Sequence, residues 1–148
     1  MNIFKAIICH DYSVLRAQKR SIQVKTNGIH MIGLVLIANI LTIAALALIY
    51  FLVNQGRNDI YLVLNELHYW EVAGRVGIIM VLCLIYLIAF AAFGGKQYFL
   101  ETIHEFISMD EDAQNATSQK GFRYFYGSLF IFFISVGVLY YLIKVAGF

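Results

Sequence analysis

The side chains best suited to chemistry are Glu101, His104 and Glu105, which form the pattern Glu-x-x-His-Glu. On a helix, residues three or four apart share a face, so these groups would lie close together. Di-metal helical bundles use a Glu-x-x-His motif, but they need more ligands than one motif supplies. We therefore expect no metal and interpret the three residues as a polar cluster on the hydrated face of an amphipathic helix. A metal site shared between two copies of the chain is the alternative.

A second set of chemically useful side chains lies inside an apolar stretch, where Asn39 and Thr42 can form hydrogen bonds. A buried amide costs several kcal/mol in hydrocarbon unless it has a partner, so we expect Asn39 to face another helix. Ala38, Thr42 and Ala45 follow the spacing i, i+4 and i+7, which places small side chains on one helical face. This face is predicted to pack against a helix, and the alternative is that it lines a pore.

Other catalytic signatures are missing from the sequence. It contains no phosphate-binding loop, Gly-x-Ser-x-Gly, His-Glu-x-x-His or dinucleotide-binding fingerprint. No ionisable residue falls at mid-depth in an apolar stretch, which argues against a transporter coupled to protons or sodium and against a haem in the membrane. We therefore expect no cofactor and no enzymatic activity.

The composition indicates which elements position these residues. Of 148 residues, 61% are apolar and 14% are charged, and mean hydropathy is +0.74. Soluble domains are about 45–50% apolar and about 25% charged. The continuous apolar stretches and the absence of proline favour an all-α integral membrane protein. A net charge of +2 is too small to indicate nucleic-acid binding.

Three stretches are predicted to cross the membrane, at residues 31–53, 76–93 and 126–145. The first reads MIGLVLIANILTIAALALIYFLV and carries no charge. As a helix it would be about 35 Å long, enough to cross a hydrocarbon core of about 30 Å. Small residues in the other two spans are predicted to pack against helices: Gly77, Ser128 and Ser135. The whole chain, 1–148, is predicted to be a single membrane domain.

Residues 1–29 form an amphipathic and basic segment before the first span. We expect an interfacial helix on the lipid headgroups, and a docking helix for a partner subunit is the alternative. Asn27-Gly28 is predicted to form a turn. The predicted headgroup contacts are Lys5, Arg16, Lys19, Arg20 and Lys25.

The segments between the spans are also predicted to be helical. Residues 54–75 carry an apolar stripe at helical spacing and are expected to form an outer interfacial helix that ends at Gly74. Residues 94–125 are expected to begin with a stop or hinge at Gly94-Gly95 and to continue as an amphipathic helix. Ser108 to Glu111 fits a capping box for a short helix that ends at Lys120-Gly121, with an acidic loop as the alternative.

The distribution of basic residues predicts the orientation. Segments 1–29 and 94–125 carry eight Lys and Arg, whereas segment 54–75 and the tail carry three. The positive-inside rule therefore places the N-terminus in the cytoplasm and the C-terminus outside, and we expect a bacterial inner (plasma) membrane. Cys9 and Cys83 are far apart along this plan, so no disulfide is expected.

An amphipathic cytoplasmic N-terminus and three spans resemble the plan of the small bacterial diacylglycerol kinases. Their motif, Glu-x-x-Asn-Ser/Thr-x-x-Glu/Asp, is absent here, and Asn65-Glu66 is the nearest match. The likeness is therefore architectural. The favoured hypothesis is a non-enzymatic subunit that binds the lipid bilayer and assembles with itself or with other membrane subunits. The alternatives are a homo-oligomeric channel or membrane-perturbing effector, and a small lipid-modifying enzyme that uses the polar cluster.

Overall fold

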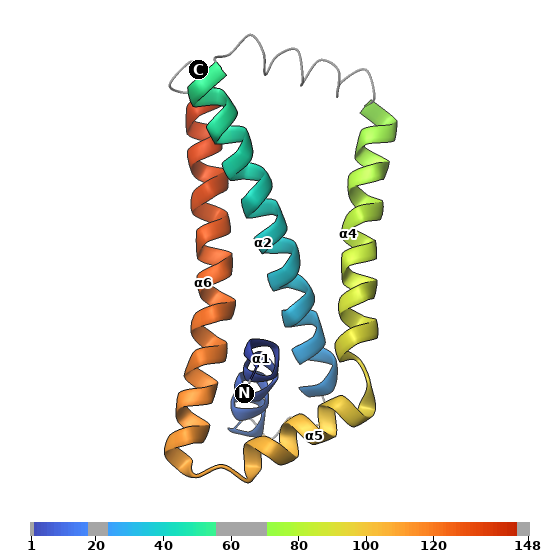
Figure 1. The fold of residues 1–148 in the computed structure, drawn as a ribbon, viewed down its shortest axis with the longest axis vertical. Coiled ribbons are helices and arrows are strands. Elements are labelled where there is room, and N and C mark those ends of the chain that lie inside the picture. The colour runs from blue at the N-terminus through green and yellow to red at the C-terminus, as the bar shows by residue number, and fades with distance from the viewer. Residues whose placement is uncertain (1, 18–23, 56–70, 145–148) are drawn as a thin grey trace.

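The computed structural model describes residues 2–17, 24–55 and 71–144, whose regular structure is entirely helical (Figure 1). The helices are α1 (Ile3–Ala17), α2 (Val24–Gln55), α4 (Glu71–Phe93), α5 (Lys96–Ile107) and α6 (Glu111–Lys144). Three of them contain stretches that are long and apolar enough to cross a membrane, at Asn27–Asn54, at Val76–Phe93 and within α6. The predicted all-α class with three such helices is confirmed.

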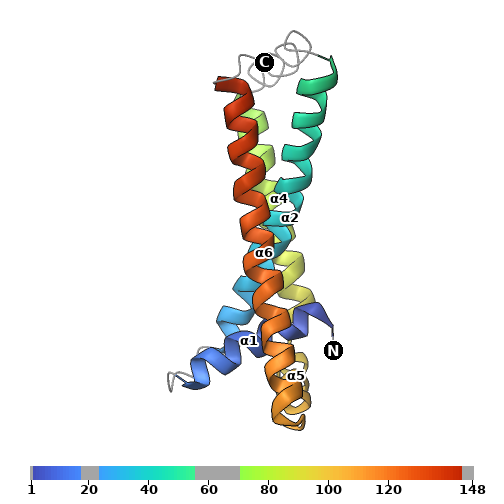
Figure 2. The same cartoon turned by 90° about the vertical axis from the view of Figure 1, so that its left-hand side faces the viewer.

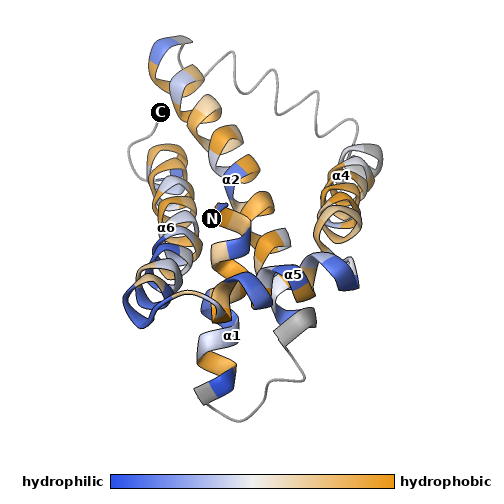
Figure 3. Cartoon of the chain, turned by 60° about the horizontal axis from the view of Figure 1, so that its bottom comes forward, coloured by the Kyte–Doolittle hydropathy of each residue, from blue (hydrophilic) through white to orange (hydrophobic). Residues whose placement is uncertain are grey.

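The long helices α2, α4 and α6 run lengthwise, and α2 packs against both of the others. In Figure 1, α2 and α6 run in the same direction and α4 returns in the opposite one. Helices α1 and α5 gather where α2 and α6 begin and α4 ends, as Figures 1 and 2 show; we call this the α1/α5 end. Figure 3 shows polar residues on α5 and at the start of α6, whereas α4 is apolar along most of its length.

The hydrophobic core lies at the α1/α5 end and draws on four helices. Its buried members are Ile7 and Ile8 of α1, Ile32 and Val35 of α2, Ala89 of α4 and Phe125 of α6. Because residues distant in sequence meet here, this end of the bundle holds the chain together. Burying one such side chain contributes about 1.5–3 kcal/mol.

Helices α2 and α6 pack through two matching stripes. The buried positions of α2 in this part of the span are Val35, Ala38, Thr42, Ala45 and Leu52. Those of α6 are Phe125, Ser128 and Ser135, whereas the buried Gly121 faces α1. The intervals between these positions are three, four or seven residues, the spacing that keeps one side of a helix facing a neighbour. Several members are small, which allows the two backbones to approach closely.

A predicted turn and a predicted helix end are wrong. Helix α2 begins at Val24, before the predicted span 31–53, so Asn27-Gly28 lies inside α2 and forms no turn. Helix α6 runs unbroken from Glu111 to Lys144, so Lys120-Gly121 does not end a short helix before the third span. Gly28 and Gly121 are both buried, and both lie where another helix crosses. They provide room for a neighbouring backbone and do not break the helix.

The connection between α5 and α6 also differs from the predicted capping box. Ser108 is the C-cap of α5, and its hydroxyl donates to the carbonyl oxygen of Glu105 at 2.8 Å. Helix α6 begins at Glu111, and the amide of Gln114 donates to the carbonyl oxygen of Asp110. Glu111 and Asp112 occupy the first turn, where the helix dipole favours negative charge.

The predicted break at Gly94-Gly95 is confirmed, because α4 ends at Phe93 and α5 begins at Lys96. A Cβ at Gly94 would meet the carbonyl oxygen of Phe90, so this bend requires glycine. The predicted interfacial helix over 54–75 lies largely outside the described residues. Its ends belong to α2 and α4, and Gly74 is inside α4, so it ends no helix.

Candidate functional site

The stretch of α1 over residues 6–9 is enclosed by the rest of the chain. Its residues Ala6, Ile7, Ile8 and Cys9 are each 0–1% exposed. Four consecutive helical residues point in all directions around the axis, so α1 is covered on every side at this point. Helices α2, α5 and α6 all pack against it. This differs from the predicted headgroup-lying helix, which would keep one face free, because α1 docks into its own chain.

Two glycines allow α1 to come this close. A Cβ at Gly121 of α6 would meet the backbone of α1, 2.5 Å from the carbonyl carbon of Ala6 and 2.9 Å from the nitrogen of Ile7. A Cβ at Gly28 of α2 would lie 3.2 Å from Cγ1 of Ile8. Real Cβ atoms essentially never show contacts below 3.0 Å. The α1–α6 crossing therefore requires glycine at position 121.

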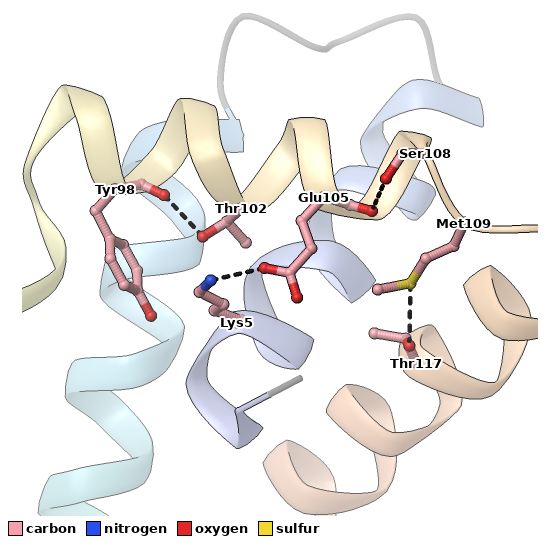
Figure 4. Close-up of polar contacts among 7 residues, drawn as sticks. All are labelled: Lys5, Tyr98, Thr102, Glu105, Ser108, Met109 and Thr117. Carbon is pink, nitrogen blue, oxygen red and sulfur yellow. Dashed lines mark hydrogen bonds and ion pairs between the residues drawn. The ribbon is translucent and has the colours of Figure 1, made fainter.

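An ion pair fastens α1 to α5. Nζ of Lys5 donates to Oε2 of Glu105 at 2.7 Å, as Figure 4 shows. The hydrogen bond raises the pKa of Lys5 and lowers the pKa of Glu105. The Lys5 ammonium also lies 5.9 Å from the centre of the Tyr98 ring. Lys5 is predicted to contact lipid headgroups, and the structure pairs its charge with Glu105 within the chain.

The predicted polar cluster of α5 is divided between two roles. Glu105 pairs with Lys5, whereas Glu101 accepts a hydrogen bond from Gln97 on its own helix at 3.0 Å. Together with His104 and Leu100, both glutamates line an open surface depression of about 400 Å³. The described residues hold no group of three or more side chains arranged to bind a metal ion.

A hydroxyl and imidazole network joins α1 to α6. Nδ1 of His10 lies 3.2 Å from Oγ of Ser118, which lies 2.9 Å from Oγ of Ser13. The Ser13 hydroxyl donates to the carbonyl oxygen of His10 at 2.8 Å. Burial lowers the pKa of His10, so this imidazole is neutral at pH 7. The network therefore fixes the three side chains without introducing charge.

Two other groups on α1 carry strongly altered pKa values. Burial raises the pKa of the Cys9 thiol to about 12, so Cys9 is an unreactive thiol at neutral pH. Burial also raises the pKa of Asp11 to about 6, and its Oδ2 has no hydrogen-bond partner among the described residues. Asp11 therefore carries an unfavourable buried charge at neutral pH.

A cavity of about 390 Å³ with both polar and apolar walls opens beside the network, where three helices meet. Helix α1 contributes Tyr12, Ser13 and Arg16 to its wall. Helix α6 contributes Gln114, Asn115 and Ser118, and Phe106 of α5 completes it. Although the sequence predicted Arg16 as a headgroup contact, it gave no sign that Arg16 would meet residues about 100 positions away.

The predicted packing face of α2 meets α6. Nδ2 of Asn39 donates to Oη of Tyr124 at 3.2 Å, so Asn39 has a partner on another helix. Ala38, Thr42 and Ala45 are buried, and the Thr42 hydroxyl donates to the Ala38 carbonyl oxygen at 2.8 Å. These polar groups are satisfied within one chain, and this arrangement does not favour a pore along that face.

The remaining predicted residues divide into three groups. Ser128 and Ser135 are buried, and the Ser135 hydroxyl donates to the Ile131 carbonyl oxygen. A Cβ at Gly77 would have no described neighbour within 4 Å, so no helix packs there in the described part of the chain. Lys19 and Arg20 lie outside the described residues, as does the side chain of Lys25.

This chain was compared with known protein families, curated proteins and solved structures. No family model, no curated protein and no solved structure matches this chain. The function must therefore be inferred from the arrangement of its own residues.

Proposed function

We propose that this chain is a non-enzymatic, multi-pass subunit of a membrane assembly. It uses α4 to bind a transmembrane helix of a second copy or of another membrane protein. The observation that carries this proposal is the sparse packing of α4. Among residues 76–93, all of which are described, Ala89 alone is buried. The helix therefore contributes little to the bundle of its own chain, and its surface is available to a neighbour.

Helix α4 has fewer main packing partners than either of the other two long helices. Helix α6 packs against both α1 and α2, whereas the main packing partner of α4 is α2. Beside this contact lies an apolar groove of about 480 Å³, lined by Ile37 of α2 and by Leu82, Cys83, Tyr86 and Leu87 of α4. Association in a membrane depends on close packing between helices, and such a groove accepts side chains of a neighbouring helix.

The contacts at the α1/α5 end also favour a non-enzymatic subunit. Its interhelical polar contacts, Lys5 with Glu105 and His10 with Ser118, fix α1 and α5 in place. With the carboxylate of Glu105 paired, two members of the predicted cluster remain for chemistry. This arrangement favours a structural role for the cluster over the lipid-modifying enzyme.

Site-specific photocrosslinking tests the proposal. A photoreactive phenylalanine replaces Leu87 of α4, and the control replaces Phe130 of α6; these side chains are 65% and 67% exposed. Irradiation in native membranes is expected to give a discrete protein adduct from position 87 and lipid adducts from position 130. A mass of twice the chain would identify a second copy. Lipid adducts alone at position 87 would overturn the proposal.

We also propose that the α1/α5 end faces the cytoplasm of a bacterium, because the basic residues concentrate there. A reporter enzyme that is active only outside the inner membrane should be active when fused after Phe148. The same reporter fused before residue 1 should be inactive. The reverse pattern would refute this orientation.

A further inference from the structure

Part of the wall of the cavity beside the hydroxyl network consists of fixed side chains. Ser13 and Ser118 are held by hydrogen bonds to each other and to His10. Nε2 of the Gln114 side chain donates to the carbonyl oxygen of Met109 at 2.9 Å, which fixes this side-chain amide next to the start of α6. A binding site whose wall is already ordered loses little conformational entropy when a ligand enters.

The aromatic members of the cavity are also fixed. Phe106 is 3% exposed, and its ring contacts that of Tyr12 edge to face, with centroids 6.1 Å apart. Such a contact contributes about 0.5–1.5 kcal/mol beyond burial. Tyr12 therefore presents its hydroxyl from a defined position on the cavity wall.

Three further groups on the cavity wall remain available to a ligand. Arg16, Tyr12 and Asn115 form no hydrogen bond or ion pair with another described residue. Arg16 and Asn115 are exposed, and Tyr12 is half-buried. The guanidinium offers five donors in a planar fork, the phenol offers one and the amide offers two. Among the described residues, the cavity wall therefore offers several donors and one permanent positive charge, that of Arg16.

Among the described residues, no carboxylate lines the cavity. The acidic residues nearest in sequence, Asp11 on α1 and Glu111 and Asp112 on α6, are absent from its wall. A cavity with a cation, several neutral donors and no anion favours a ligand that is negatively charged and rich in acceptor oxygens. Arginine binds phosphate oxygens with two parallel hydrogen bonds, which a single amine cannot reproduce.

We propose that this cavity binds a phosphate group, with Arg16 as the charged ligand-binding residue and Tyr12 and Asn115 as additional donors. The cavity lies at the α1/α5 end, beyond the apolar stretches of the long helices. The phosphate can therefore belong to a lipid headgroup or to a small soluble phosphomonoester. The inference does not depend on which protein α4 binds.

Native mass spectrometry of the purified full-length protein in a phosphate-free maltoside detergent tests this proposal. Three probes separate the possible sources: phosphatidic acid, diacylglycerol with the same acyl chains, and glycerol 3-phosphate. We expect an adduct with phosphatidic acid and none with diacylglycerol. Competition by glycerol 3-phosphate would show that the phosphate alone is sufficient, whereas its failure to compete would assign the site to lipid. Equal adducts with phosphatidic acid and diacylglycerol, or no adduct with any probe, would overturn the proposal.

Two arginine variants test whether the phosphate group binds in this cavity. Arg16→Gln removes the charge within the cavity, and Arg123→Gln removes a charge from α6 outside this cavity. Arg16→Gln should weaken phosphatidic acid binding about tenfold or more, since hydrogen bonds to charged groups are the stronger ones. Arg123→Gln should leave binding unchanged. An equal loss in both variants would show nonspecific attraction to basic residues and would contradict the assignment. Because Arg16 is exposed, Arg16→Gln should fold normally, and an unchanged thermal midpoint verifies this.

Discussion

Replacement of Gly121 by alanine should release α1 from the bundle. The new Cβ would lie 2.5 Å from the carbonyl carbon of Ala6 and 2.9 Å from the nitrogen of Ile7, whereas ordinary contact begins at 3.4 Å. These contacts must lengthen by 0.9 Å and 0.5 Å. The obstructing atoms are backbone, so no rotamer change relieves them. Overpacking costs about 1–3 kcal/mol, and the rigid obstacle here favours the upper end.

The reactivity of Cys9 measures this release directly. In a Cys83→Ala background, Cys9 is the single thiol, and it is fully buried with its pKa raised to about 12. Alkylation by a maleimide therefore requires α1 to move away. The helix propensity of alanine is the same whether α1 is docked or released, so it does not alter this equilibrium. A cost of 1–3 kcal/mol should accelerate alkylation about 5-fold to 150-fold.

Gly127→Ala on the same helix is the matched control. A Cβ at Gly127 has no described neighbour within 4 Å, so α1 should remain docked and the alkylation rate should not change. Alanine is also the better helix former by about 1 kcal/mol, so this variant should be at least as stable as the parent protein. Equal alkylation rates in Gly121→Ala and Gly127→Ala would refute the enclosed position of α1.

Three further substitutions test individual contacts. Asp11→Asn should stabilise the protein well above pH 6 by up to about 3 kcal/mol and have little effect below pH 3.8, because the folded-state pKa of about 6 exceeds the ordinary value and the charged form is therefore penalised. Thermal midpoints across this pH range check this, and a gain that is equal at all pH values would contradict it. Lys5→Glu should destabilise the α1–α5 contact by about 1 kcal/mol or less, and Lys5→Glu with Glu105→Lys should recover the loss, because the pair is partly exposed. A double-mutant cycle in denaturant measures the coupling, and its absence would exclude the ion pair. Asn39→Leu combined with Tyr124→Phe should reveal a coupling of about 0.6 kcal/mol, typical of hydrogen bonds between membrane helices. Additive effects would show that Asn39 and Tyr124 do not interact.

Apolar stretches in the sequence predicted the three long helices because hydropathy is a local property. The bend at Gly94-Gly95 was also predictable, since two adjacent glycines interrupt a helix whatever surrounds them. Gly28 and Gly121 were misread because glycine has two uses. It ends helices, and it also allows another backbone to approach. The second use depends on where α1 lies, and no local pattern gives that position.

For charged residues too, the sequence predicts the general location and does not predict the partner. The basic character of residues 1–29 predicted a segment outside the membrane, but it did not distinguish a charge that faces lipid from one that is paired. Lys5 meets Glu105, 100 positions away, and His10 meets Ser118, 108 positions away. These contacts arise because α1 packs against α5 and α6 at the α1/α5 end. The candidate phosphate site could not be predicted for the same reason, since its walls come from helices distant in sequence.

The mass of the intact particle tests the central proposal most directly. Native mass spectrometry of the protein released from its own membranes should give a discrete complex heavier than the 16.9 kDa chain. Replacing Leu84 and Leu87 of α4 with bulky tryptophan should dissociate this complex, whereas Gly127→Ala should not. A single species at 16.9 kDa before any substitution, with bound lipid alone, would contradict the assignment as a subunit of an assembly.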